Sequence, residues 1–292
     1  MENRQYPTKG NCRQAVPQAD PNHEATEGTR EFYERSYSTD RRKDRLRGSR
    51  FTKVWYRAAI EHCLPQLKIT GSRVLEVGCG FGLLGSSLAE LGAQFIGVDI
   101  ALSAVSQFSR SPGVRCYPVV ADGRFLPFSD AAFDVLFCME VLEHAPDPEP
   151  LVDECFRVVR PGGHLVFSCP NYFSLLIVPK LLAELGWPFF RRYVGRQLID
   201  RLTTSFSLRR LLTRRGNVLL QRAVRLHPPF FEELDNRLAD GHPLRRINDW
   251  VFAIERRWGH RAPVCYLGQH TLIMAQADPR APASPASDGS LP

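Results

Sequence analysis

The residues best suited to chemistry gather in one short stretch after a predicted strand. An apolar run ends at the acid Glu76. Three glycines follow at alternate positions, Gly78, Gly80 and Gly82. Glycine adopts positive φ without strain, so the backbone can turn sharply and let a ligand approach closely. A second acid, Asp99, ends the next predicted strand, where a doubly wound sheet binds ribose hydroxyls. The pattern predicts a nucleoside site with an acidic lining.

Strand-length and helix-length segments alternate around this stretch. After the strand that ends near Glu76, further strands are expected at 94–98, 114–120, 133–138, 164–169, 218–224 and 264–275. Helices are expected at 83–91, 149–160 and 208–215. Such alternation predicts an α/β fold with a parallel sheet and helices on both faces.

Three further motifs complete a family pattern. Ala121-Asp122-Gly123 follows the third expected strand, Glu140-Val-Leu-Glu-His144 follows the fourth, and Arg160-Pro-Gly-Gly163 precedes the fifth. With the glycine loop and Asp99, these motifs resemble the class I S-adenosylmethionine-dependent methyltransferases, in particular the ubiquinone- and menaquinone-type small-molecule enzymes. The resemblance covers 74–171 closely and the rest weakly. It implies a doubly wound, mostly parallel seven-stranded sheet of Rossmann-like class I methyltransferase type, with a helical cap insertion.

The resemblance also implies the cofactor and its contacts. S-adenosyl-L-methionine is the expected cofactor, with its ribose hydroxyls on Asp99 and its adenine amino group on Asp122. The cofactor-binding residues that the resemblance implies are Glu76, Gly78, Cys79, Gly80, Gly82, Asp99, Ile100, Asp122, Gly123 and Met139. The segment before the sheet folds over the cofactor in this family, so Tyr33 and Tyr37 are candidate lids or, equally, packing aromatics.

His144 is the candidate catalytic residue. Histidine changes charge near neutral pH, so it suits a general base that takes the proton of a hydroxyl acceptor. The alternative is a residue that caps or packs at the start of a helix. Glu140, Glu143 and His144 also repeat the Glu-x-x-Glu-His pattern with which ubiquinone O-methyltransferases and small-RNA 2′-O-methyltransferases hold a divalent ion. Many relatives carry a similar run with no known metal, so a divalent metal stays an alternative.

Two other function classes fit the same glycines. Gly80-Phe-Gly82-Leu-Leu-Gly85 matches the dinucleotide fingerprint, which leaves an NAD-dependent oxidoreductase as an alternative. A dinucleotide places a pyrophosphate at the helix N-terminus, where Glu76 would oppose it. S-adenosylmethionine instead carries a sulfonium and an ammonium, and both suit an acidic lining. A non-catalytic S-adenosylmethionine-binding protein is the third class.

Composition limits the class of protein and its partners. No run of about 18 apolar residues appears, so no transmembrane helix is expected. The polar first residues lack a signal core, and the eight cysteines include no Cys-x-x-Cys pair. A cytoplasmic protein with reduced thiols is the interpretation. The net charge of +7 is concentrated at 41–50 and 191–261. Solvent-exposed helix faces are the best explanation of these basic residues. An anionic small substrate or an anionic membrane surface is the next candidate partner, and nucleic acid is the third.

The chain is expected to form one domain with loose ends. Residues 1–28 are predicted to be disordered, 29–276 to form the methyltransferase domain, and 277–292 to be a flexible tail. Two segments, 172–203 and 226–262, depart from a minimal methyltransferase and are expected to cap the strand ends. They are rich in aromatic residues, which either form the core of the cap or line a substrate pocket. If the aromatics face inward, the methyl acceptor is a small hydrophobic or aromatic metabolite, most simply methylated on oxygen.

Overall fold

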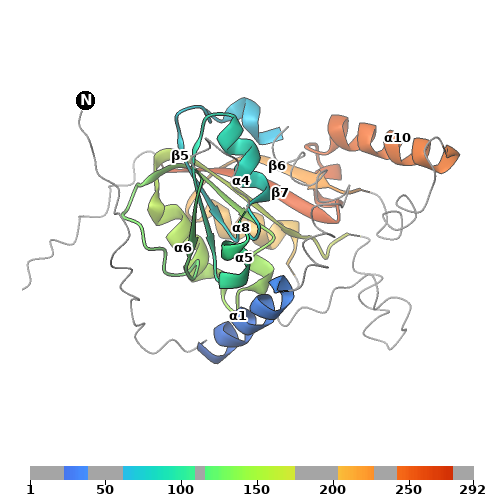
Figure 1. Ribbon diagram of the computed structural model, residues 1–292. Helices are drawn as coiled ribbons and strands as arrows, with labels where there is room; N and C mark the ends of the chain where they lie inside the picture. Colours follow the sequence, from blue (N-terminus) through green and yellow to red (C-terminus); the bar gives the residue numbers. More distant parts are fainter. Residues whose placement is uncertain (1–22, 39–61, 109–115, 175–202, 227–241, 279–292) are drawn as a thin grey trace, which may run out of the picture.

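The fold is described for five stretches of the chain. The computed structural model describes residues 23–38, 62–108, 116–174, 203–226 and 242–278 of the 292 (Figure 1). Residues 175–202 of the first cap segment and 227–241 of the second lie outside these residues, so the inward-facing aromatic pocket there stays a prediction. No described helix is both long and apolar enough to cross a membrane.

Seven strands form a single sheet in the order β3-β2-β1-β4-β5-β7-β6. The strands are β1 (Arg73–Val77), β2 (Gln94–Asp99), β3 (Cys116–Val120), β4 (Phe133–Met139), β5 (Val159–Pro170), β6 (Gly216–Val224) and β7 (His270–Ala277). The first five strands run parallel, whereas β7 runs antiparallel to both β5 and β6. This confirms the expected seven-stranded, mostly parallel sheet of the class I methyltransferase fold.

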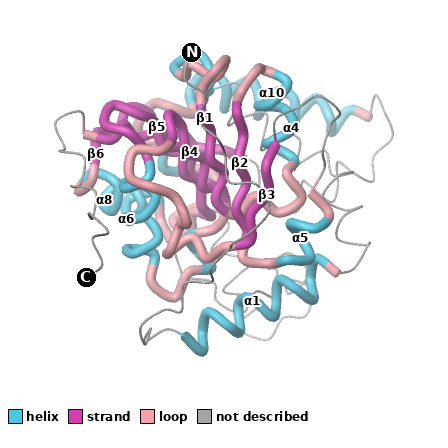
Figure 2. Tube along the Cα trace, turned by 60° about the vertical axis from the view of Figure 1, so that its left-hand side comes forward, coloured by secondary structure: helices cyan, strands magenta, loops and turns pink. Residues whose placement is uncertain are grey.

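Helices cover both faces of the sheet and one of its ends. The longer ones are α1 (His23–Tyr37), α4 (Leu83–Glu90), α5 (Leu102–Ser106), α6 (Pro148–Val158), α8 (Ser205–Thr213) and α10 (Pro243–Trp258). Figure 2 shows α6 and α8 on one side of the sheet and α4 on the other. In both views α1 lies beside α5, and the two helices are in contact.

The starts of α6 and α8 follow from local sequence. The side chain of Asp147 accepts a hydrogen bond from the Glu149 amide, and Pro148 occupies the first helical position, where its missing N–H costs nothing. Thr204 and Ser207 form a reciprocal capping box at the start of α8. These caps fix where the two helices enter and therefore which apolar face each one turns to the sheet.

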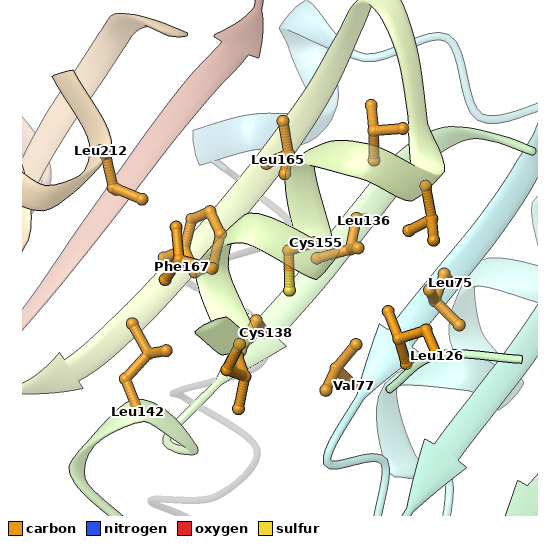
Figure 3. Close-up of a cluster of buried hydrophobic side chains, with 14 of the residues drawn as sticks. Leu75, Val77, Leu126, Leu136, Cys138, Leu142, Cys155, Leu165, Phe167 and Leu212 are labelled. Atoms are coloured by element: carbon orange, nitrogen blue, oxygen red, sulfur yellow. The ribbon is translucent and has the colours of Figure 1, made fainter. Parts of the chain in front are cut away.

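Two apolar cores lie on opposite faces of the sheet because side chains alternate along a strand. In β5, Val166 belongs to the core beneath α4, whereas Leu165 and Phe167 belong to the core beneath α6 and α8. Figure 3 shows this second core, in which Cys155 from α6 and Leu212 from α8 meet the strands. The described cysteines are all buried.

The largest differences from the predicted element boundaries are at the starts of α1, β5 and β7. The first helix begins at His23, so residues 23–28 are helical and not part of the polar tail. The fifth strand begins at Val159, so the expected turn at 160–163 lies within it, where its pairing with β4 is irregular. The last strand begins only at His270, because the preceding residues form a short 3-10 turn.

Candidate active site

The glycine loop follows β1 and is tightly enclosed. Gly78, Gly80 and Gly82 have φ angles of 75°, 51° and 72°, a region that side chains rarely adopt. A Cβ atom on Gly78 would overlap Val141, and one on Gly82 would overlap the neighbouring Phe108 ring. Glycine is therefore required at these positions by backbone conformation and, at the first and third, by lack of space.

Asp99 links the end of β2 to this loop. Its Oδ2 accepts a hydrogen bond from the Gly80 amide and its Oδ1 accepts one from the Ala101 amide, each at 2.9 Å. The loop is also tied to β2 by the amides of Gly78 and Cys79, which both donate to the Val98 carbonyl. The structure thus brings the two sequence motifs together, with the carboxylate of Asp99 buried against the glycines.

Glu76 is a buried acid with an unmade hydrogen bond. Only 1% of its surface is exposed, and its Oε2 has no hydrogen-bond partner among the described residues. Burial, and after it the charge of Asp99, raises the pKa of Glu76 well above its usual value. A ligand cation would supply the missing partner, whereas a pyrophosphate would meet two carboxyl groups. The donor set fits S-adenosylmethionine better than NAD.

The other predicted cofactor-binding residues lie at the ends of β2, β3 and β4 or just after them. Asp122 is held by Arg124, whose Nη2 lies 2.8 Å from its Oδ2. An adenine amino group would therefore share this carboxylate with a guanidinium. Ile100 directly follows β2, Gly123 packs against Val77, and Met139 ends β4 as a buried side chain. The cofactor roles of these residues remain predictions from the resemblance.

Helix α1 lies over the glycine loop. A Cβ atom on Gly80 would lie 3.2 Å from the Tyr37 hydroxyl, and the Tyr37 ring packs edge-on against Phe81, with 4.9 Å between ring centroids. The carboxylate of Glu34 accepts hydrogen bonds from the Leu102 and Ser103 amides, which ties α1 to α5. Burial opposes ionisation of this carboxyl, but its hydrogen bonds, led by that from Ser103, lower the pKa of Glu34. Tyr37 is thus placed as a cover over Gly80.

The segment after β4 turns sharply at Glu140 and forms only one short helical turn. Glu140 has a φ of 56°, and only Leu142–His144 form a 3-10 turn. Glu140 turns toward β5 and β7, where it accepts a hydrogen bond from the Ser168 hydroxyl. Glu143 is buried, and its Oε1 lies 3.5 Å from the His144 Nε2. Glu140 and Glu143 therefore do not share a helical face.

A metal site does not assemble from this run. The described residues contain no group of three His, Cys, Asp or Glu side chains placed to hold a metal ion. Glu140 instead contacts Ser168, whereas Glu143 contacts His144.

A protein-family model matches the part of the chain that holds the glycine loop. Residues 75–167 match the model described as a methyltransferase domain. The chain contains a class I S-adenosylmethionine-dependent methyltransferase domain. This matched stretch runs from β1 through β5, so it includes the glycine loop, Asp99 and the segment after β4.

Relatives of this methyltransferase domain are named for ubiquinone biosynthesis. The ubiquinone biosynthesis O-methyltransferase of Paraburkholderia phymatum is 43% identical over 107 residues, which cover 35% of this chain and 46% of that protein. That of Alkalilimnicola ehrlichii is 37% identical over 155 residues, which cover 49% of this chain and 62% of that protein. The chain spans about half the length of the curated relatives it matches first.

Solved structures share the fold of the methyltransferase domain. An S-adenosylmethionine-dependent methyltransferase of Thermotoga maritima aligns with a TM-score of 0.56 at 15% identity, covering 85% of this chain and 99% of that one. Magnesium protoporphyrin IX methyltransferase of Synechocystis PCC 6803, solved with bound SAH, aligns with a TM-score of 0.58 at 14% identity, covering 87% and 100%. At such identities the likeness shows the fold alone.

A buried asparagine, Asn171, directly follows β5 in the methyltransferase domain. Its fully buried amide nitrogen donates to the carbonyls of Tyr266 and Gly268, and its oxygen accepts from the Ser205 amide. Nearby, Phe206 stacks on Tyr266 with 4.4 Å between ring centroids. Asn171 thereby fixes three chain segments beside the strand ends where ligands bind in open α/β sheets.

Sequence reasoning missed two polar residues at this edge of the methyltransferase domain. His270 begins β7 and Arg225 follows β6. Neither residue belongs to a motif that the sequence links to the site. Because β7 is antiparallel, its first residue lies beside Pro170, at the carboxyl end of β5. The only sequence signal was a polar pair, Gln269 and His270, just ahead of an apolar strand.

Proposed function

We propose that this chain transfers the methyl group of S-adenosylmethionine to an oxygen atom of a small hydrophobic or aromatic acceptor. The observation that carries the proposal is the acidic pair at the glycine loop, in which Glu76 is buried with an unmade hydrogen bond beside Asp99. This lining favours a cationic nucleoside over a dinucleotide. The names of the relatives, which are O-methyltransferases of ubiquinone biosynthesis, support oxygen as the acceptor atom.

The protein's main contribution to such a reaction is positioning. S-adenosylmethionine, when bound, supplies a methyl group already activated by its sulfonium. Glu76 and Asp99 would hold its cationic and ribose groups, and Tyr37 would exclude water from the loop. His144 is the predicted base, and Tyr33 packs against its ring with 5.5 Å between centroids. A hydroxyl acceptor gains from such a base at neutral pH.

The acceptor class is tested by transfer of labelled methyl groups. The purified chain is incubated with S-adenosylmethionine labelled in its methyl group and with sets of phenolic, glycosidic and lipid-linked hydroxyl compounds. We expect labelled methyl ethers from phenolic or lipid-linked members. Tight cofactor binding with no product from any set would instead support the non-catalytic binding protein.

Glu76→Gln is expected to stabilise the free protein and weaken cofactor binding. The carboxyl's folded-state pKa is raised, so its ionisation destabilises the fold. That cost is absent below the unfolded-state pKa near 4.3, grows as the pH rises toward the folded-state pKa, and is constant above it. At neutral pH the variant should therefore melt about 2–4 °C higher. It should bind S-adenosylmethionine about fivefold more weakly, since the cation loses a charged partner.

Titration calorimetry in two buffers tests whether Glu76 loses its proton when S-adenosylmethionine binds. Binding of the cation favours ionised Glu76, so the wild type should release protons on binding, and the heat should depend on the buffer's ionisation enthalpy. Glu76→Gln should lose that dependence. A variant that is less stable than the wild type and binds equally well would contradict this role for Glu76.

We further propose that α10 makes peripheral contact with anionic membranes. Trp250 and Trp258 are 65% and 42% exposed, and with exposed Ile247 they fall on one face of the helix. Arg257 and Arg261 lie over the Trp258 ring. Aromatic side chains beside arginines suit the interface of an anionic bilayer.

The membrane contact is tested by sedimentation with vesicles. Removing both rings by Trp250→Ala with Trp258→Ala should lower the fraction bound to phosphatidylglycerol vesicles about fivefold, and salt should weaken wild-type binding. Tyr117→Ala is the matched control, because Tyr117 is half-exposed on β3 at the opposite edge of the sheet. Equal binding of the wild type to neutral phosphatidylcholine vesicles would rule out the anionic surface as partner.

A further inference from the structure

A histidine outside the predicted site lies between two residues with unusual backbone conformation. Among the described residues, three that are not glycine have positive φ: Ala131, Glu140 and Arg225. Two of these contact His270. The Oε2 of Glu140 lies 2.9 Å from its Nδ1, and the Nη1 of Arg225 lies 3.3 Å from its Nε2. Left-handed residues of this kind concentrate at functional sites, where the surrounding structure holds them.

This cluster lies at the edge of the sheet where the cofactor loop is. Glu140 ends the turn out of β4, and the next residue, Val141, packs on Gly78 of the glycine loop. The His270 side chain keeps 14% of its surface exposed and that of Glu140 keeps 29%. The three residues come from the ends of β4, β6 and β7, so rigid elements hold them, and a ligand can still reach them.

The contacts define the protonation of the ring. A guanidinium can only donate, so the Nε2 that faces Arg225 must present its lone pair. The ring proton then lies on Nδ1, on the side of the Glu140 carboxylate. A neutral ring in this tautomer can accept a proton at Nε2, and the carboxylate stabilises the imidazolium that results.

We propose that His270 is the proton acceptor for the hydroxyl of the methyl acceptor, with Glu140 and Arg225 as positioning residues. This inference rests on the proposed methyl transfer. In the complex the acceptor hydroxyl takes the place of the Arg225 guanidinium at Nε2. The acceptor's O–H bond then breaks and its proton moves to Nε2, while an oxygen electron pair forms the new bond to the methyl carbon. The electrons of the breaking C–S bond stay on sulfur, and the imidazolium returns its proton to water. Arg225 stabilises the negative charge that develops on the oxygen.

Among the described residues, a carboxylate and a guanidinium are in direct contact with the His270 ring. Glu140 approaches from β4 and Arg225 from the end of β6. Burial, followed by the nearby carboxylates Glu143 and Glu140, raises the pKa of Cys169 in β5, so that thiol is neutral. Burial raises the pKa of Glu255 in α10, near Arg225.

The test compares pH profiles of methyl transfer to catechol, or to whichever phenol of the screen is methylated fastest. We expect His270→Gln to lower kcat about 100-fold and to remove the acid limb of the profile, so that the rate rises with pH toward the pKa of a phenol near 10. Glu140→Gln should shift the acid limb to lower pH, because the imidazolium loses its carboxylate. Imidazole added to His270→Ala should restore part of the activity.

His164→Gln is the matched control. His164 lies in β5, pairs with Gln276 away from the cofactor edge, and should keep the wild-type profile. His144→Gln separates the two candidate bases, since only the true base loses the acid limb. Retention of the acid limb by His270→Gln, or failure of imidazole to rescue His270→Ala, would overturn the proposal.

A measurement on the free protein separates this inference from the proposed function. Nitrogen-15 NMR of the His270 ring should show a protonated Nδ1 and an unprotonated Nε2 at neutral pH, with the pattern lost in His270→Gln. The same variant should bind S-adenosylmethionine with unchanged affinity. If the wild type binds no S-adenosylmethionine, the proposed function fails. If the ring shows the opposite tautomer, the inference fails while the proposed function stands.

Discussion

Replacing Gly80 with valine is expected to abolish binding of S-adenosylmethionine, with a rise in Kd of at least about 1,000-fold, equivalent to about 4 kcal/mol. Gly80 has a φ of 51°, which a β-branched residue adopts only with strain. Its Cβ position lies 3.2 Å from the Tyr37 hydroxyl, so the valine methyl groups would fill the space between the loop and α1. Isothermal titration calorimetry measures the loss.

Gly71→Val is the matched control for this substitution. Gly71 also has a positive φ, 77°, but a Cβ there would meet nothing within 4 Å, and it lies in the turn before β1. Both variants therefore bear similar backbone strain, and only one fills the proposed site. We expect Gly71→Val to lose stability and keep its affinity. Equal affinities of both folded variants would show that the cofactor binds elsewhere.

Asp99→Ala is expected to raise the Kd for S-adenosylmethionine about 100-fold. The carboxylate is predicted to accept hydrogen bonds from the ribose hydroxyls, and each charge-assisted bond contributes about 1.5–3 kcal/mol. It also anchors the amides of Gly80 and Ala101, so its loss loosens the loop that shapes the site. Because both amides lose their acceptor, the variant should also melt at a lower temperature than the wild type.

Asp134→Ala separates that loss of stability from the loss of affinity. Asp134 likewise accepts a hydrogen bond from a backbone amide, that of Arg73, and it pairs with Arg160. It lies at the amino ends of the strands, far from the glycine loop. Asp134→Ala should therefore melt at a lower temperature and bind normally. A normal Kd for Asp99→Ala would contradict the assignment of Asp99 to the ribose.

The cofactor side of the site could be predicted from the sequence because its signals are local. Alternate glycines after an apolar run indicate a left-handed turn, and Asp99 follows at the end of the next strand. Parallel topology then requires the two to meet at one edge, and the Gly80–Asp99 hydrogen bond confirms that they do. The seven strands were predicted for the same reason, since each is a short apolar run.

The cluster of His270, Glu140 and Arg225 could not be predicted, because its contacts join residues that are distant in sequence. His270 reaches Glu140 only because β7 inserts antiparallel between β5 and β6, and no local pattern specifies that insertion. The left-handed Glu140 was also hidden, since a non-glycine residue ordinarily adopts a right-handed or extended conformation. No sequence motif therefore indicated that Glu140 would contact Ser168 and His270.

The assignment of S-adenosylmethionine as the cofactor is tested most directly by titrating the wild-type chain in parallel with S-adenosylmethionine and with NAD⁺. The acidic pair of Glu76 and Asp99 predicts saturable binding of S-adenosylmethionine at one site, loss of that binding in Gly80→Val, and no binding of NAD⁺ at the same concentrations. Saturable binding of NAD⁺ that Gly80→Val abolishes, without binding of S-adenosylmethionine, would contradict the proposed function.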